Sequence, residues 1–316
     1  MSEFWSIFSF SLSVTGPILL VLAAGIWLRQ RQFITDEFVH IGSRLVFTIA
    51  LPMLLFISIV KTHISQAANI SLVAFGAVTT ILIFILLEIV AQFWVKPAED
   101  RGVVVQGGFR SNLGIIGLAY GVNAYGTSVL AAASLYLGLI TILLNILSVI
   151  TLSRSLHKDK GIKNILLGIF KNPLILAILI ALPISLAEIT LPKIILQTGE
   201  YFAQLTLPLA LLCTGASLDF HSLRQALPNT LGAAFSKLIF MPTVFVLGAM
   251  ALGFKGMDMG ILLLMSSAPT AAASYVMTKA MGGNATLAAN IIAITTLGSL
   301  FTTSLGIMWV KGMGLM

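Results

Sequence analysis

The sequence predicts an all-α membrane protein, with ten transmembrane helices arranged as two inverted five-helix repeats. Composition, a series of long apolar segments and a match between the two halves predict this fold class. Of the 316 residues, 58% are hydrophobic and only 9% are charged, whereas soluble domains carry about 25% charged residues. Because one soluble core cannot hide so large an apolar surplus, we expect lipid to surround the protein.

Ten apolar segments approach the length of about 20 residues that a membrane-spanning helix requires. The first has no basic region before it and no small-residue cleavage site after it, so we interpret it as a span and not as a signal peptide. The ten expected spans are Val14–Leu28, Leu45–Val60, Leu72–Trp94, Val103–Val122, Val129–Leu152, Pro173–Ile189, Tyr201–Leu218, Thr230–Leu252, Met259–Met277 and Thr286–Val310.

The two halves of the chain resemble each other at a nearly constant offset. A shift of 156 residues places GPILL at Gly16 on NPLIL at Asn172, IALPMLL at Ile49 on LTLPLAL at Leu205, and GAVTTILIF at Gly76 on GAAFSKLIF at Gly232. We therefore predict repeats at residues 1–152 and 165–316, joined by a polar linker at 153–164. Because each repeat holds five spans, the second must run inverted, a plan common in secondary transporters.

Lysine and arginine predict the orientation, since they concentrate in cytoplasmic loops. If the N-terminus lies outside, twelve basic loop residues face inward and four face outward. The inward set is Arg29, Arg31, Arg44, Lys96, Arg101, Arg154, Lys158, Lys160, Lys163, Lys171, Arg224 and Lys279, and the outward set is Lys61, Lys193, Lys255 and Lys311. We expect both termini outside a cell inner membrane. The net charge of +7 is too scattered for a nucleic-acid surface.

The fourth and ninth spans carry residues that interrupt helices. The fourth is rich in glycine, and Pro269 lies near the middle of the ninth, where proline breaks a helix. A shift of 157 places Asn112 on Pro269, so both helices are predicted to break at one depth and cross. Plain helix packing through small residues is the alternative. Exposed helix N-termini would suit an anion there, with binding residues Arg110, Ser111, Asn112, Gly114, Ser267, Pro269, Thr270 and Ser274.

Three ionisable residues, Glu88, Arg110 and Lys237, lie in the interior of predicted spans, and such residues are functional candidates because hydrocarbon disfavours charge. Arg110 either snorkels to the interface or attracts an anion from the cytoplasmic side. Glu88 and Lys237 are expected in the inner half of the membrane. They either form a structural ion pair or include a group that binds and releases a proton during transport.

The sequence contains no motif for an enzyme or a cofactor. HExxH, P-loop and zinc-ligand patterns are absent, and the single cysteine, Cys213, cannot form an intrachain disulfide. We expect no cofactor, no metal and no catalytic residues.

Several stretches together resemble the auxin efflux carrier family in its bacterial branch. They are WLRQRQFITDEFVHIGSRLVFTIALPMLLFISI, GGFRSNLGIIGL, NPLILAILIAL, LPLALLCTGASL and SKLIFMP. The resemblance implies the fold of bile-acid/sodium symporters, with spans one, two, six and seven as a scaffold and the other six as a transport domain. It implies weak organic acids as substrates, such as auxin or malate and malonate, and carboxylate binding by Asn112. Gly117-Leu118-Ala119 departs from the family's Gly-Leu-Pro, which puts the sharpness of the fourth-span break in question.

We therefore predict a carrier that moves a small mono- or dicarboxylate by alternating access, as a homodimer formed through the scaffold. A sodium- or proton-coupled symporter or antiporter of another solute is the main alternative. A passive channel or a ligand sensor is less favoured. The sequence names neither the substrate nor the coupling ion.

Overall fold

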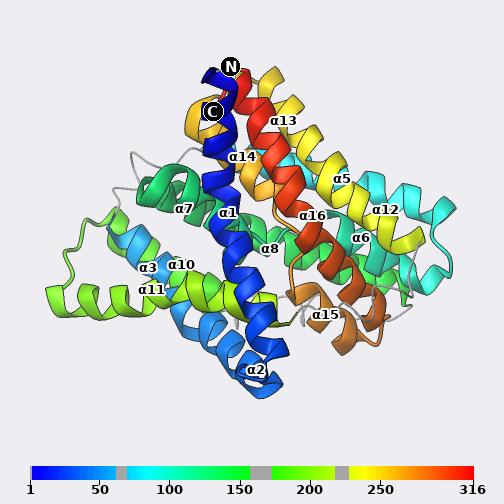
Figure 1. Ribbon diagram of the computed structural model, residues 1–316, viewed down its shortest axis with the longest axis horizontal. Coiled ribbons are helices and arrows are strands. Elements are labelled where there is room, and N and C mark those ends of the chain that lie inside the picture. Colours follow the sequence, from blue (N-terminus) through cyan, green and yellow to red (C-terminus); the bar gives the residue numbers. More distant parts are fainter. Residues whose placement is uncertain (1, 62–69, 157–172, 218–227) are drawn as a thin grey trace.

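A computed structural model describes residues 2–61, 70–156, 173–217 and 228–316, and in these ranges the chain is helical (Figure 1). The elements follow one another as α1 Ser2–Gln30, α2 Asp36–Leu45, η1 Val46–Ala50, α3 Leu51–Val60, α5 Ile70–Trp94, η2 Ala98–Asp100, α6 Arg101–Phe109, η3 Leu113–Gly117, α7 Leu118–Tyr125, η4 Gly126–Val129, α8 Leu130–Ser155, α10 Pro173–Leu186, α11 Lys193–Ala216, α12 Pro228–Phe235, η6 Ser236–Phe240, α13 Met241–Ala251, α14 Gly256–Ser267, α15 Ala273–Met281 and α16 Ala285–Gly312.

Six helical stretches in the described ranges are long and apolar enough to cross a membrane. They are Trp5–Gln30, Asp36–Ile57, Ile70–Trp94, Leu113–Ser155, Pro228–Ala251 and Ala285–Gly312, with shorter apolar helices at Leu176–Leu186 and Gly256–Ser267. The ten expected spans all fall on helices, but several are short or interrupted. Part of the expected linker, residues 157–164, lies outside the described ranges, as do the basic residues Lys158, Lys160, Lys163, Lys171 and Arg224.

Local sequence signals start several helices. The Thr35 hydroxyl accepts a hydrogen bond from Phe38 N, and Asp36 and Glu37 fill the first turn of α2, where carboxylates favour the helix dipole. The Asn284 side chain accepts from Leu287 N and caps α16. Pro52 and Pro242 are the second residues of α3 and α13, directly after the π-helical turns η1 and η6 of continuous helices, where proline supplies no helical N–H donor.

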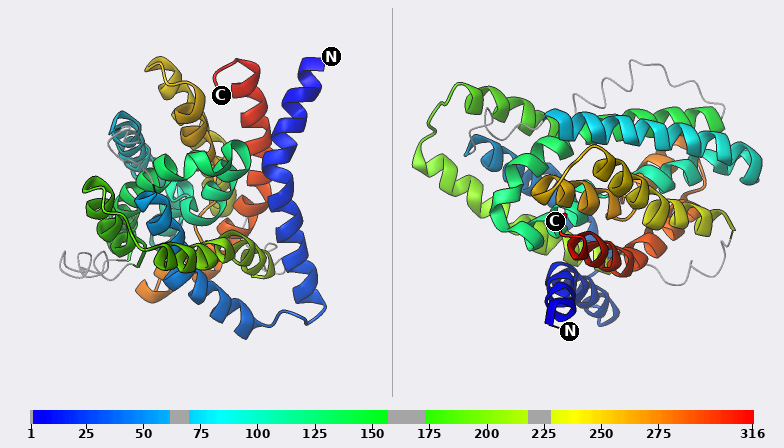
Figure 2. Two further views of the ribbon diagram at one scale, coloured as in Figure 1. Left: turned by 90° about the vertical axis from the view of Figure 1, so that its left-hand side faces the viewer. Right: turned by 90° about the horizontal axis from the view of Figure 1, so that it is seen from above.

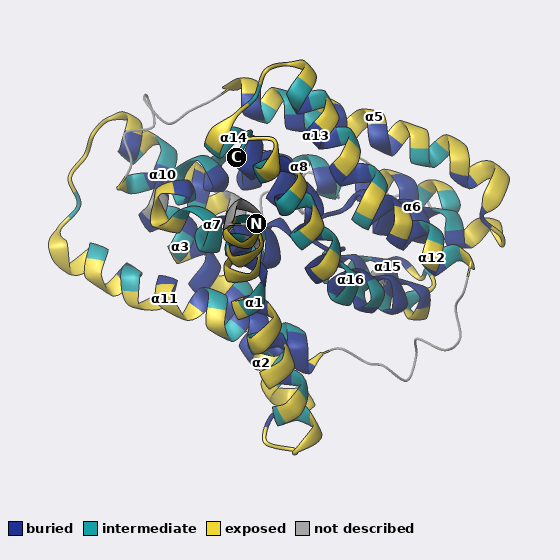
Figure 3. Ribbon diagram, turned by 45° about the horizontal axis from the view of Figure 1, so that its top comes forward, coloured by how far each residue is buried: buried dark blue, intermediate teal, exposed yellow. Residues whose placement is uncertain are grey.

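The outer surface is apolar in the way that lipid contact requires. On α5, the exposed residues Val78, Leu82, Ile85 and Ile89 recur at helical spacing along one stripe, whereas Thr80 is buried on the opposite side. Figure 3 shows the same pattern, with exposed residues lining the outward side of α5. Soluble monomers rarely expose contiguous apolar patches of this extent.

One group of helices is built around α11, and its members α1 and α3 also pack against α7, α8 and α16. Helix α11 packs against α1, α2 and α3, and α10 packs against α3. Glycines allow α1 and α11 to touch backbone to backbone, because a Cβ at Gly25 would lie 2.3 Å from Leu212 O and a Cβ at Gly215 would lie 2.2 Å from Leu22 O. The remaining helices surround α6 and α14, and both termini lie at the same end of the molecule (Figures 1 and 2).

Candidate functional site

Two helical rods are interrupted at the centre of the molecule. Helix α6 ends at Phe109, and Arg110 and Asn112 leave helical geometry with ψ angles of 96° and 69° before η3 begins. Helix α14 ends at Ser267, and Ala268 adopts ψ 140° before Pro269. The α6 interruption lies upstream of Ala119, so the missing proline at that position does not prevent it.

The two interruptions bind each other through their backbones. Ser111 and Thr270 form an isolated antiparallel bridge, with Asn112 N donating to Pro269 O at 2.7 Å and Ala271 N donating to Arg110 O at 3.0 Å. Asn112 and Pro269, the two positions that the offset of 157 aligns, are therefore hydrogen-bonded. The bridge gives hydrogen-bond partners to two backbone N–H groups and two carbonyl groups that lie outside the helices and so have no partner within a helix.

Side chains bond to the carbonyl groups exposed where α6 and α14 end. Thr270 Oγ1 donates to Gly107 O at 2.7 Å, and Ser236 Oγ donates to Gly108 O at 3.3 Å. Lys237 Nζ donates to Ser266 O at 2.6 Å. The last carbonyl groups of a helix have no partner within it, so these three contacts stabilise both interruptions.

Polar side chains without a partner lie at the same crossing. The hydroxyl groups of Ser111 and Ser274 are buried and have no hydrogen-bond partner. The Asn112 side chain, also buried, makes no hydrogen bond that the described ranges contain. Beside them begins η3, whose first N–H groups have no intrahelical acceptor, whereas at the start of α15 Ser274 N and Tyr275 N donate to Ala271 O and Ala272 O. Buried polar groups in this state suit a ligand that accepts hydrogen bonds.

Arg110 supplies a buried positive charge at the crossing. It is 5% exposed, and its Nη2 donates to Asn145 Oδ1 of α8 at 2.6 Å while Nη1 lies 3.4 Å from Met277 Sδ. No carboxylate within the described residues pairs with it. A buried charge without a counter-ion is costly, and a bound anion would lower that cost.

A family model described as a membrane transport protein matches residues 13–307, which is nearly the whole chain. The chain belongs to the auxin efflux carrier family of membrane transporters.

Relatives of this transporter are distant but match over more than nine-tenths of its length. It is 23% identical over 302 residues to the uncharacterized transporter YfdV of Escherichia coli K12, which covers 92% of this chain and 95% of the relative. It is also 23% identical over 297 residues to the uncharacterized transporter MJ1031 of Methanocaldococcus jannaschii, with 91% and 95% covered. The resemblance read from the sequence is confirmed. The protein is a multi-pass membrane transporter, which favours transport over catalysis.

Glu88 and Lys237, both within described ranges, do not form an ion pair with each other. Glu88 bonds to Thr151 of α8 and forms an ion pair with Arg154 Nη1 at 3.1 Å, which ties α5 to α8. Lys237 instead contacts Ser266 O and Met241 Sδ, the latter at 3.2 Å. The structural ion-pair interpretation therefore does not describe the contacts that these two residues make.

The other expected site residues take packing positions. A Cβ on Gly114 would lie 3.0 Å from Leu51 Cδ2, so this glycine lets η3 approach the start of α3. The Ser267 carbonyl faces Thr303 Oγ1 at 3.5 Å. Gly117 plays a similar part, because a Cβ there would lie 2.9 Å from Met265 Sδ. The glycine-rich fourth span is therefore both closely packed against its neighbours and interrupted at residues 110–112.

Two polar residues near the crossing were not among the expected site residues. Asn145 holds the Arg110 guanidinium, and fully buried Gln106 accepts from Thr278 Oγ1 at 3.2 Å. A polar amide within an otherwise apolar span is the signal that could have identified both. Together they extend the polar surface of the crossing along α6, α8 and α15.

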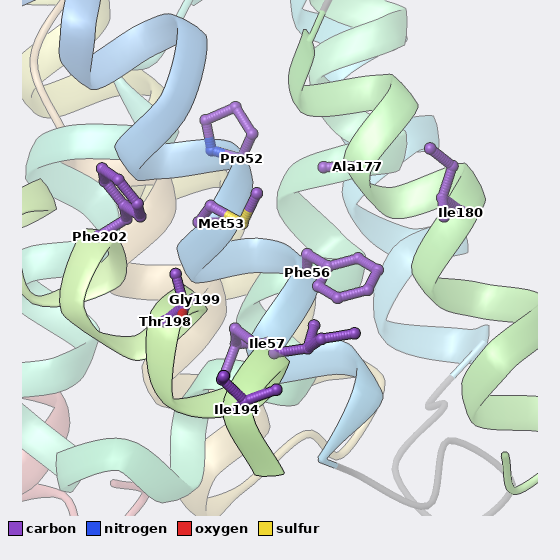
Figure 4. A pocket seen from close by; sticks show the side chains of 11 residues that line it. Pro52, Met53, Phe56, Ile57, Ala177, Ile180, Ile194, Thr198, Gly199 and Phe202 are labelled. Carbon is purple, nitrogen blue, oxygen red and sulfur yellow. The ribbon is translucent and has the colours of Figure 1, made fainter. Parts of the chain in front are cut away.

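A separate apolar groove of about 490 Å³ lies among α3, α10 and α11. Its lining includes Met53, Phe56, Ile180 and Phe202 (Figure 4). None of its lining residues belongs to α6, η3, α14 or α15. Because the groove offers no charge to a carboxylate, we place the candidate site at the crossing.

Proposed function

We propose that this transporter is a secondary carrier of small organic anions, mono- or dicarboxylates, and that the anion binds where α6 and η3 cross α14 and α15. The observation that carries this proposal is the buried Arg110 guanidinium, which has no counter-ion among the described residues and lies next to unpartnered Ser111. A carboxylate would supply both the charge and the acceptors that this site lacks.

The proposed architecture is ten spans in two inverted repeats, residues 1–152 and 165–316. Supporting it are the constant sequence offset, the bonded pair of Asn112 and Pro269, and the interruption of one rod in each half. In this proposal the group α1–α3, α10 and α11 is a scaffold, and the remaining helices are a transport domain that rocks or slides against it.

The proposed topology places both termini outside the cell inner membrane. Its support is the twelve-to-four distribution of basic loop residues and the location of both termini at one end of the molecule (Figure 2). We also propose that two copies associate through the scaffold as a homodimer. Alkylation of single cysteines at the chain termini by a membrane-impermeant reagent would test the topology.

A sodium- or proton-coupled symporter or antiporter moves a coupling ion together with or against its substrate, whereas a simple exchanger needs no coupling ion. Glu88 and Lys237 are the ionisable candidates in the membrane besides Arg110. Glu88 is engaged with Arg154, so Lys237 of η6, whose Nζ contacts the end of α14, is the better placed of the two to respond to events at the crossing.

Counterflow in liposomes tests the function. Purified protein is reconstituted into vesicles loaded with one unlabelled carboxylate from a panel, and uptake of the labelled form is measured against protein-free vesicles. We expect saturable counterflow for at least one member. Flux that never saturates would indicate a channel, and binding without flux would indicate a sensor; either result would reject the carrier.

A further inference from the structure

One π-helical turn contacts the ends of both interrupted helices. Adjacent residues of η6 are involved: Ser236 Oγ donates to Gly108 O near the end of α6, and Lys237 Nζ donates to Ser266 O near the end of α14. Insertions of this kind in helices are often found at functional sites. The α6 contact is made by a neutral hydroxyl group, whereas the α14 contact is made by an amino group.

Lys237 is held there without a carboxylate. Its side chain is fully buried, and Met241 Sδ, a weak acceptor, is its second contact. Across the described ranges no acidic group pairs with it. The negative end of the α14 dipole, equivalent to about half an elementary charge, is therefore the principal compensation for the ammonium group.

This is the location that a coupling cation occupies in transporters with interrupted helices. In such proteins the C-terminal ends of half-helices and the unwound carbonyls coordinate the coupling ion. Here the Ser266 carbonyl is already bonded to Nζ at 2.6 Å. An inorganic cation at the same carbonyl would be repelled at short range in a medium of low dielectric constant.

We propose that Lys237 is a tethered cation that substitutes for a coupling inorganic cation at the end of α14, so that transport is independent of sodium. The inference rests on the proposed carrier function and specifies its coupling. Because the ammonium group belongs to the chain, it is not released during the transport cycle. A sodium gradient therefore contributes nothing to the driving force for transport.

Sodium replacement in the unmodified protein tests the proposal directly. Exchange of labelled malate, or of another carboxylate that counterflow identifies, is measured with sodium on both sides and again with N-methyl-D-glucamine replacing it. We expect rates within about twofold of each other. A loss of tenfold or more without sodium overturns the tethered cation but leaves the carrier function intact.

Thermal unfolding of the purified protein decides the point even if no carboxylate in the panel is exchanged. A cation that binds only the folded state raises the melting temperature. We expect the same melting temperature in sodium and in N-methyl-D-glucamine at equal ionic strength. A sodium-specific rise that saturates with concentration would reveal an inorganic cation site and overturn the proposal.

Two substitutions separate the charge from the shape of the side chain. Lys237→Met keeps the length and removes the charge, and Lys237→Arg keeps the charge. In sodium-free medium we expect Lys237→Met to lose exchange at least tenfold and Lys237→Arg to retain more. Exchange by Lys237→Met at the unmodified rate overturns the proposal. If Lys237→Met does not fold, the sodium-replacement and unfolding measurements on the unmodified protein still decide.

Discussion

The interruption between α14 and α15 contains Pro269, whereas the interruption between α6 and η3 contains no proline in residues 110–112. Proline cannot donate the helical hydrogen bond and clashes with the preceding turn, so the first break is inherent in its sequence. The second depends on partners from elsewhere: the Thr270 hydroxyl, the Ser236 hydroxyl and the backbone bridge to residues 269–271.

The two breaks also carry different side chains. The α6 break presents Arg110, Ser111 and Asn112, which are charged or polar, whereas the α14 break presents mainly alanine around Pro269 and Thr270. We infer that the α6 side contributes most of the recognition and the α14 side contributes shape. The predictions below test this division of roles.

Arg110→Ala is expected to have the largest effect. Removing one partner of a buried, hydrogen-bonded charge pair costs about 2–5 kcal/mol, so the half-saturating concentration in counterflow should rise at least about thirtyfold. Arg110→Lys should recover part of the loss, because it restores charge but not the planar fork.

Arg154→Ala is the matched control for Arg110→Ala. Arg154 is also a cation next to polar groups of a span, but it lies in the last turn of α8, pairs with Glu88 of α5 and is largely exposed. We expect it to change the half-saturating concentration less than about threefold, as exposed ion pairs contribute at most about 1 kcal/mol. Equal losses in the two variants would remove Arg110 from the binding site.

Asn112→Ala is expected to have the next largest effect, about fivefold in uptake, since one neutral hydrogen bond contributes about 1 kcal/mol. The backbone N–H that binds Pro269 O remains in this variant, so the melting temperature should be nearly unchanged. Asn123→Ala is the control, because Asn123 Nδ2 donates to Val14 O. That variant should lower the melting temperature and leave uptake unchanged; unchanged uptake by Asn112→Ala would place the anion elsewhere.

The membrane class, the family and the positions of the two breaks could be predicted from the sequence. Proline at 269 and clustered glycines at 107, 108, 114 and 117 are local signals, and the offset between halves related the two. The length of the apolar segments also located the spans, because a helix in lipid forms all its backbone hydrogen bonds within the segment.

The partners of buried charges could not be predicted in the same way. Depth along a helix places Glu88, Arg110 and Lys237 at similar levels, but rotation about the helix axis decides which neighbour each one meets. Glu88 turns toward α8, where Arg154 follows Thr151 by three residues, and Lys237 turns toward the end of α14. The sequence does not specify that rotation until the packing of α5, α8 and α13 is known.

Thr270→Val tests whether the α6 break depends on its side-chain partner. The substitution keeps the shape but leaves Gly107 O buried and without the Thr270 donor, which costs about 1–3 kcal/mol. We expect a lower melting temperature and reduced uptake. Thr296→Val is the control: its hydroxyl donates to Ile292 O at the same 2.7 Å, but that carbonyl keeps its helical N–H partner within α16. Similar losses in both variants would show that Thr270 has no special role.

Pro269→Ala is expected to have the smallest effect, although proline is the most obvious helix breaker in the sequence. The carbonyl of residue 269 and the N–H of Ala271 keep their bonds to the α6 side in the variant. The main cost is the greater freedom of the unfolded chain, about 0.4–1 kcal/mol, so uptake should fall less than about threefold. If Pro269→Ala instead abolishes uptake while Thr270→Val does not, the proline and not the crossing bonds maintains the interruption. The α6 break would then not depend on its bond to Thr270, and only the intrinsic character of the α14 break would stand.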